Sequence, residues 1–262
     1  MFKTRLLSGI VLVILALITI ISGNLVLFCT LLGISLIGMQ ELYRAMGVRE
    51  DRFNALELAG YGGAVIFYLT LLLGQTKYEM TALLFGLVGI MCVYVFAYPK
   101  YRAEQVMAAF FGIVYVAVML SYIYQTRNLE DGKFIVWLIF ICSWGSDTCA
   151  YCVGMLIGKH KMAPVLSPKK SVEGGVGGVA GAALIGGVYG AAVHSDIAMY
   201  AVIGAVGALI SMVGDLAASA IKRNREIKDY GTLIPGHGGI LDRFDSVIFT
   251  SPFIYFLAAV LL

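Results

Sequence analysis

Long apolar segments separated by short polar loops run through the whole chain. Nine of them come near the length of about 20 residues that a helix needs to cross a bilayer. A segment in lipid must satisfy its own backbone hydrogen bonds, which a helix does. The predicted spans are 6–22, 25–43, 56–74, 79–98, 106–124, 134–158, 174–194, 197–221 and 246–262. We therefore expect an all-α, polytopic integral membrane protein.

Composition supports this prediction and excludes a soluble domain. The chain has 262 residues, of which 60% are hydrophobic and 13% charged. Soluble domains carry about 45–50% apolar and about 25% charged residues. The first apolar run is longer than that of a signal peptide and no A-x-A cleavage pattern follows it, so it is interpreted as a membrane helix. We expect no nucleic-acid partner.

The basic residues are distributed unequally between the loops. With the N-terminus inside, 16 of the 19 Lys and Arg residues fall on the inner face and 3 on the outer face. The positive-inside rule then places the N-terminus and the polar loops in the cytoplasm and the C-terminus outside. The compact chain favours the inner membrane of a bacterium. We expect one membrane domain over 1–262, with a helical scaffold at 1–130 and catalytic helices and loops at 134–262.

One ionisable residue interrupts the sixth predicted span. Asp147 lies in an apolar stretch, where a charge is costly unless it faces a partner, an ion or water. Ser143 and Tyr151 lie four residues to either side, so on a regular helix the three share a face. The alternative is a structural Asp bonded to a neighbouring helix.

Two later spans carry small residues at every fourth position, which allows another helix to approach closely. In the seventh span they are Gly174, Gly178, Ala182, Gly186 and Gly190. In the eighth span the strip becomes polar toward the inner end and comprises Gly207, Ser211, Asp215, Ser219 and Arg223. The first strip predicts helix packing, and the second predicts a cavity open to the cytoplasm.

The loop GKHKMAPVLSPKKSVEGG, residues 158–175, joins these spans on the inner face. Pro164 and Pro168 prevent a continuous helix. Its four lysines suit phosphate groups, and Lys170, Ser171 and Glu173 are candidates for contact with a nucleotide or a lipid headgroup. The alternative is ordinary sorting of positive charge to the inner face. The loop lacks the P-loop pattern.

The densest polar stretch runs from Gly214 to Asp245. Asp242 and Asp245 are three residues apart and share a face on a helix, while Asp215 comes from another helix. Hard carboxylate oxygens suit Mg²⁺, which is often shared with substrate phosphates. The cations Lys222, Arg223, Lys228 and Arg243 would oppose phosphate charge. This set favours phosphoryl or nucleotidyl transfer, and the alternative is a polar loop with salt bridges.

The same stretch resembles the signature of a known family, the phosphatidate cytidylyltransferases or CDP-diacylglycerol synthases. The resemblance is carried by SAIKRNREIKDYGTLIPGHGGILDRFD, residues 219–245. The upstream segments WGSDTCAYCVG and GKHKMAPVLSPKKSVEGG resemble a second block of that family. The first five spans match it only in hydropathy.

The resemblance implies a Mg²⁺-dependent enzyme of phospholipid biosynthesis that joins CTP and phosphatidic acid into CDP-diacylglycerol and pyrophosphate. It also implies a homodimer, and it leaves open a second, monovalent cation. The residues implied in catalysis are Asp215, Asp242, Asp245, Lys222 and Arg223, and the three aspartates would bind the metal. The residues implied in substrate binding are Ser219, Lys228, His237, Arg243, Asp147, Lys170, Ser171 and Glu173.

Two rival interpretations stay open at the level of the residues. Another CTP-dependent membrane lipid transferase or a lipid kinase would share the metal and the basic loop, but not the full signature. A secondary transporter could use Asp147 and Asp215 for ion coupling. Transporters of that kind have internal repeats, whereas here polar density is confined to one half of the chain.

Overall fold

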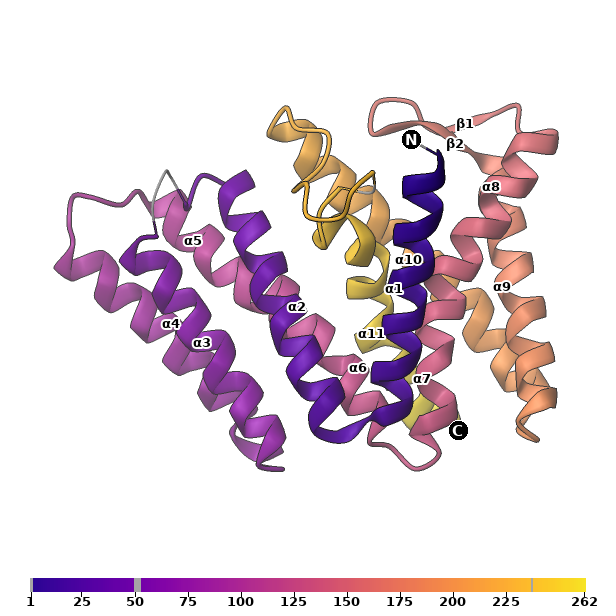
Figure 1. Ribbon diagram of the computed structural model, residues 1–262, viewed down its shortest axis with the longest axis horizontal. Helices are drawn as coiled ribbons and strands as arrows, with labels where there is room; N and C mark the ends of the chain where they lie inside the picture. Colours follow the sequence, from indigo (N-terminus) through magenta and orange to yellow (C-terminus); the bar gives the residue numbers. More distant parts are fainter. Residues whose placement is uncertain (1, 50–52, 237) are drawn as a thin grey trace. The chain divides into compact units, whose positions relative to one another are not determined.

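The structure, a computed structural model, describes residues 2–49, 53–236 and 238–262, with side chains described from residue 9 onward. Most of the described chain is helical (Figure 1). Its contacts divide it into two compact units. Unit 1 comprises Met1–Tyr124 and Arg225–Arg243, and unit 2 comprises Gln125–Asn224 and Phe244–Leu262.

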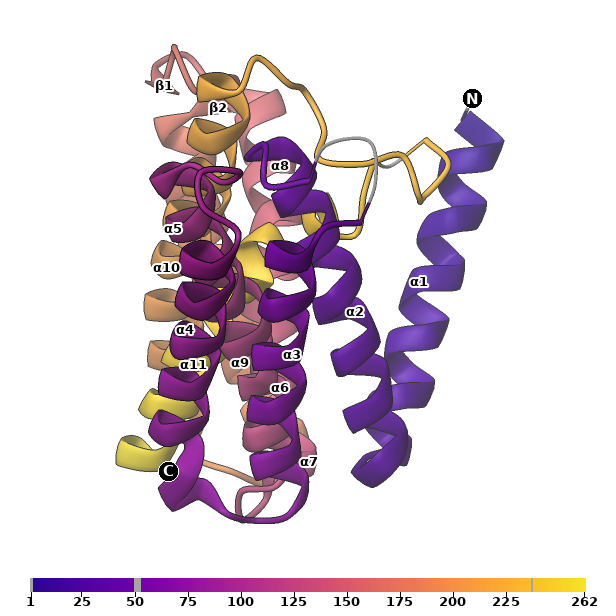
Figure 2. The ribbon, with the colours of Figure 1, turned by 90° about the vertical axis from the view of Figure 1, so that its left-hand side faces the viewer.

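Unit 1 is built from the first six helices and the polar loop that precedes the last one. The helices are α1 (Phe2–Ser22), α2 (Asn24–Ala45), α3 (Ala55–Leu72), α4 (Glu79–Phe96), α5 (Ala103–Gly112) and α6 (Met119–Arg127), whose end from Gln125 onward belongs to unit 2. A 3₁₀ turn at Thr76–Tyr78 precedes α4, and a π-helical segment at Ile113–Val118 joins α5 to α6. Figure 2 shows α1 beside α2 and away from α3, α4 and α5.

A buried tyrosine organises the core of unit 1. The Tyr43 hydroxyl on α2 donates a hydrogen bond of 2.6 Å to the carbonyl of Ala109 on α5. Gly60 and Gly112 leave room for the ring, since a Cβ atom at either position would lie against it. A buried Tyr needs such a partner for its hydroxyl. The ring thereby fixes α2 against α3 and α5.

Unit 2 contains the remaining helices and a small hairpin. The helices are α7 (Gly132–Phe140), α8 (Ser146–Ile157), α9 (Val172–Ala192), α10 (Ile197–Asn224) and α11 (Leu241–Leu261), whose first turn belongs to unit 1. A π-helical segment at Ile141–Gly145 joins α7 to α8. Between α8 and α9, β1 (Lys161–Ala163) pairs antiparallel with β2 (Ser167–Ser171). The loop predicted to be non-helical is therefore this hairpin.

The predicted small-residue strip of α9 is a packing surface inside the chain. A Cβ atom at Gly174 would lie 2.7 Å from the carbonyl of Ala150 on α8. At Gly186 it would lie 2.6 Å from the carbonyl of Tyr200 on α10. The two neighbouring helices thus approach the backbone of α9 directly, which only small residues permit. The predicted packing role is confirmed.

The all-α, polytopic fold is also confirmed. Eight helical segments of the described chain are long and apolar enough to cross a membrane, namely Asn24–Ala45, Ala55–Leu72, Thr76–Phe96, Ala103–Arg127, Gly132–Ile157, Val172–Ala192, Ile197–Asn224 and Leu241–Leu261. The first predicted span is α1, whose described apolar part is the shorter Gly9–Ser22. The single membrane domain with its catalytic C-terminal half stays a prediction.

The close approach of α9 and α10 predicts a stability effect at Gly186. Gly186→Ala forces the Tyr200 carbonyl to shift, and such overpacking typically costs about 1–3 kcal/mol. We expect a lower thermal unfolding midpoint in detergent. The control is Gly89→Ala in α4, where a Cβ atom would meet nothing within 4 Å. There the better helix propensity of Ala should leave the midpoint unchanged or raise it. Equal midpoints for the two variants would contradict the packing described here.

Candidate functional site

Five charged residues of unit 2 gather around the C-terminal part of α10 and the N-terminal part of α11. This aspartate–lysine cluster comprises Asp147, Lys170, Asp215, Lys222 and Asp245. Lys170 of β2 forms an ion pair with Asp215 of α10. Lys222 of α10 places its Nζ 4.0 Å from Oδ2 of Asp245 on α11. Asp245 also interacts electrostatically with Asp215 and, more weakly, with Asp147 of α8. Three helices and the hairpin thus converge on one set of charges.

The cluster is largely removed from solvent. Asp245 and Lys222 are each 8% exposed, whereas the side chains of Lys170 and Asp215 retain 27% and 22%. Desolvated charges persist only when they are paired and hydrogen-bonded. Three carboxylates and two ammonium groups leave one net negative charge when all are ionised. The cluster can therefore accept a cation, while its lysines can contact an anion.

The regular helix of α10 explains which of its two last basic residues is buried. A step of four residues advances a helix by about 400°, so a strip at every fourth position drifts by about 40° per step. The buried face therefore follows Ser211, Gly214, Ala218 and Lys222. Arg223, which the four-residue strip included, is exposed. Its predicted place on a polar strip that opens to the cytoplasm, and its role toward a substrate, stay predictions.

The π-helical segment Ile141–Gly145 changes the spacing around Asp147. A π turn holds more residues than an α turn, so four-residue spacing no longer marks one face. Ser143 is fully buried and donates a hydrogen bond of 2.7 Å to the Ile139 carbonyl. Tyr151 is 69% exposed. The predicted common face is therefore wrong for Ser143. Asp147 and Tyr151 lie four residues apart within the regular helix α8, and Asp147 interacts with the cluster.

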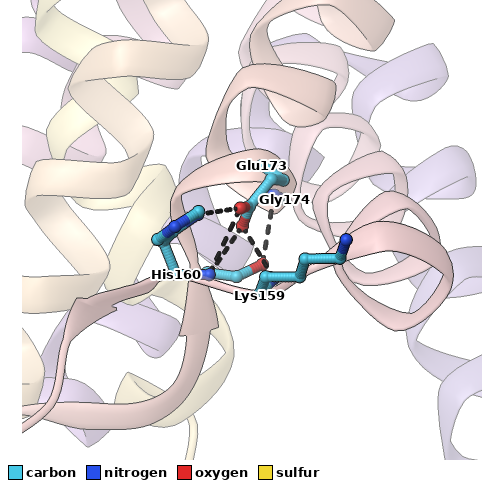
Figure 3. Close-up of polar contacts among 5 residues, drawn as sticks. Lys159, His160, Glu173 and Gly174 are labelled. Atoms are coloured by element: carbon cyan, nitrogen blue, oxygen red, sulfur yellow. Dashed lines mark hydrogen bonds and ion pairs between the residues drawn. The ribbon is translucent and has the colours of Figure 1, made fainter.

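Two predicted substrate contacts have visible structural roles in the hairpin. The Ser171 hydroxyl accepts a hydrogen bond of 3.1 Å from the Gly174 N–H and so caps α9. The Glu173 carboxylate accepts the N–H groups of Lys159 and His160 at 3.1–3.2 Å. It also lies 2.6 Å from Nδ1 of His160 (Figure 3). These bonds fix the hairpin that carries Lys170.

The polar loop Arg225–Arg243 in unit 1 is tied down by carboxylates. Asp242 is 5% exposed. Its Oδ2 accepts the N–H of Tyr230 at 2.8 Å and that of Gly239 at 3.0 Å. Glu41 of α2 accepts the N–H groups of Ile240 and Leu241. The contact of Glu41 with the loop was not predicted from the sequence, where Glu41 is only a carboxylate near the end of an apolar span.

The other predicted site residues differ in exposure. Ser219 is buried, Arg243 is half-buried, and Lys228 is exposed. His237 lies outside the described residues. In the described part of the chain, no three His, Cys, Asp or Glu side chains are grouped to hold a metal ion. The three-aspartate metal site therefore stays a prediction.

Comparison with known proteins identifies relatives over the whole chain. A sequence profile of the cytidylyltransferase family matches residues 3–261. The chain is 30% identical to "Phosphatidate cytidylyltransferase" of Bacillus subtilis (strain 168), covering 98% of this chain and 97% of the relative. It is 32% identical to the protein of that name from Staphylococcus epidermidis, with 97% and 98% covered. A Synechocystis protein of the same name is 29% identical over 98% and 97%.

The bonds of Glu173 predict a local effect on the hairpin. Glu173→Gln keeps the size of the side chain but replaces charge-assisted hydrogen bonds with weaker neutral ones. We expect the amides of Lys159 and His160 to exchange hydrogen for deuterium roughly fivefold faster or more. Exchange mass spectrometry measures this, with the exposed Glu130→Gln as the matched control. Unchanged exchange in Glu173→Gln would show that the carboxylate does not hold the hairpin.

Proposed function

Because the chain belongs to the cytidylyltransferase family, we propose that the aspartate–lysine cluster is part of the site at which it transfers CMP from CTP to phosphatidic acid. The products are CDP-diacylglycerol and pyrophosphate. The observation that carries the assignment is the buried pair of Asp245 and Lys222, with Asp215 beside it. Buried charge of this density among membrane helices is functional by default.

The reaction makes electrostatic demands that this cluster can meet. A phosphate oxygen of phosphatidic acid attacks the α-phosphorus of CTP, and the bond from that phosphorus to the pyrophosphate oxygen breaks. The attacking oxygen is already anionic, so no general base is needed. Both substrates bring negative charge, and Lys170 and Lys222 would offset it as point charges. Stabilising charge in a dry, preorganised site is the main contribution expected from the protein.

The carboxylates of the cluster fit a divalent cation. Asp215 and Asp245 interact across two helices although both are acidic, and one is nearly fully buried. Their oxygens are the hard ligands that Mg²⁺ prefers, and Mg²⁺ typically uses one or two protein carboxylates with waters and substrate phosphates. When bound, Mg²⁺ would neutralise phosphate charge and polarise the α-phosphate. We propose Asp242 as a further ligand and leave open a monovalent cation.

The remaining assignments rest on the resemblance of the signature. We propose Arg223 as a catalytic cation. The proposed substrate contacts are Ser219, Lys228, His237, Arg243, Asp147, Lys170, Ser171 and Glu173. For Ser171 and Glu173 the contact would be indirect, through the hairpin that they fix. When the substrate binds, Lys170 would leave its ion pair with Asp215 and pair with a substrate phosphate.

The setting of the enzyme is also proposed. The protein is a multi-pass membrane protein, and the distribution of basic residues supports a cytoplasmic N-terminus and cytoplasmic active-site loops in the inner membrane. We propose a homodimer. Its interface would not use the small-residue strip of α9, because α8 and α10 occupy that strip within the chain. Light scattering of the purified protein, corrected for detergent, tests the dimer.

The assignment predicts large losses of activity in the cluster. Purified protein in mixed micelles is given phosphatidic acid, labelled CTP and Mg²⁺, and label is followed into chloroform-soluble lipid. We expect Asp245→Asn and Lys222→Met to lower kcat roughly 100-fold or more, as for loss of one transition-state contact. The control is Asp196→Asn, which only weakens the cap on Met199 at the far end of α10.

If the Asp245→Asn protein is folded and keeps wild-type kcat, the aspartate–lysine cluster is not part of the site of CMP transfer. A folded wild-type protein that phosphorylates a lipid without forming a CDP-lipid would instead indicate a lipid kinase. Identification of the labelled lipid by mass distinguishes these outcomes.

A further inference from the structure

A carboxylate of α2 holds the backbone at the start of α11. Oε1 of Glu41 accepts the Ile240 N–H at 3.0 Å, and Oε2 accepts the Leu241 N–H at 2.8 Å. Glu41 is 5% exposed. All these groups belong to unit 1. A buried carboxylate with both oxygens bonded to backbone N–H groups indicates a fixed connection between α2 and the loop.

The connection replaces a local cap that the sequence of α11 lacks. The first N–H groups of a helix have no partner within it, and Ser, Thr, Asp or Asn just before the helix usually supplies one. Here Ile240 precedes Leu241 and has no polar side chain. Glu41, 199 residues away from Ile240 in sequence, supplies the acceptor instead. A negative charge at this end also interacts favourably with the helix dipole.

Two glycines of the loop leave room for this carboxylate. A Cβ atom at Gly231 would lie 2.8 Å from Cδ of Glu41, and one at Gly239 would lie 2.5 Å from the same atom. Real Cβ contacts are essentially never that short. The loop is therefore folded around the Glu41 side chain, and larger residues at either position would displace it.

The same backbone also binds Asp242. Gly239 donates its N–H to Oδ2 of Asp242 while its Cα faces Glu41, so the two carboxylates hold one turn from different sides. Tyr230, next to Gly231, donates to the same oxygen of Asp242. Loosening Glu41 would therefore release the groups that orient Asp242.

We propose that Glu41 is a positioning residue for catalysis. It holds the loop Arg225–Arg243 and the first turn of α11 in the conformation that orients Asp242, and it does not itself contact substrate. This inference rests on the proposed role of the signature loop in CMP transfer. It adds a residue from the N-terminal half, which the signature does not include.

The test compares two buried carboxylates of unit 1. In Glu41→Gln, the amide NH₂ would face one of the two backbone N–H donors, so one hydrogen bond is lost without a change in size. The matched control is Glu57→Gln in α3, since Glu57 is 0% exposed. The carboxylate of Glu57 bonds to the side chains of Arg49 and Tyr61 rather than to the loop.

For Glu41→Gln we expect kcat to fall roughly 10–100-fold, the range seen when residues that orient metal ligands are replaced. The Mg²⁺ concentration for half-maximal activity should rise, and the amides of Tyr230 and Gly239 to Leu241 should exchange faster with deuterium. For Glu57→Gln we expect a lower thermal midpoint, kcat within about threefold of wild type, and unchanged exchange in these amides. Glu41→Asp, too short to reach both donors, should resemble Glu41→Gln although it keeps the charge.

Three results would overturn the proposal: wild-type kcat in Glu41→Gln, equal losses of kcat in both Gln variants, or unchanged loop exchange with lowered kcat. A separate variant tests whether Asp242 takes part in the reaction, and this role fails if Asp242→Asn leaves kcat unchanged. In that case the exchange and kcat of Glu41→Gln still decide whether Glu41 holds the loop for catalysis.

Discussion

Charged side chains in a lipid-soluble chain must compensate one another where they are desolvated, and this constraint shapes unit 2. Asp245 is almost completely buried, and an isolated charge there would cost several kcal/mol. Lys222 approaches it from α10, and Lys170 pairs with Asp215 from the hairpin. The hairpin in turn depends on Ser171 and Glu173. The hairpin thus places Lys170 beside Asp215.

A second constraint acts on the backbone of the signature loop. A loop rich in glycine can adopt many conformations, and ordering it is entropically costly. Glu41 and Asp242 offset that cost because each carboxylate accepts two backbone N–H groups of the same short segment. A loop held by carboxylates from two helices keeps its shape without a local helix cap. Such preorganisation is what transfer between two anionic substrates requires.

The fold was predictable because hydropathy alone determines which segments can lie in lipid. Asp215 and Asp245 stood out in the sequence because they lie in its densest polar stretch, Gly214 to Asp245, and their role as metal ligands stays a prediction. Three features were not predictable. The π-helical segment before Ser146 removed the regular spacing, and the drift of α10 put Lys222 rather than Arg223 on the buried face. Glu41 accepts a hydrogen bond from the backbone N–H of Ile240, 199 residues away, and a sequence does not show which backbone groups a side chain will bind.

The reaction joins a lipid to a soluble nucleotide, so the site must be reached from both the bilayer and the water. A cluster deep in the membrane would exclude CTP, and one on an extended soluble loop would exclude phosphatidic acid. Asp245 is in the first turns of α11, a helix long and apolar enough to cross a membrane, while Lys170 lies in the hairpin that follows α8. Partial exposure of Asp215 and Lys170 beside buried Asp245 and Lys222 fits this requirement. The charges at the open side can exchange partners when an anion arrives, while those at the buried side keep their geometry. We therefore expect Lys170 to govern substrate capture, and Asp245 with Lys222 to govern the transfer step.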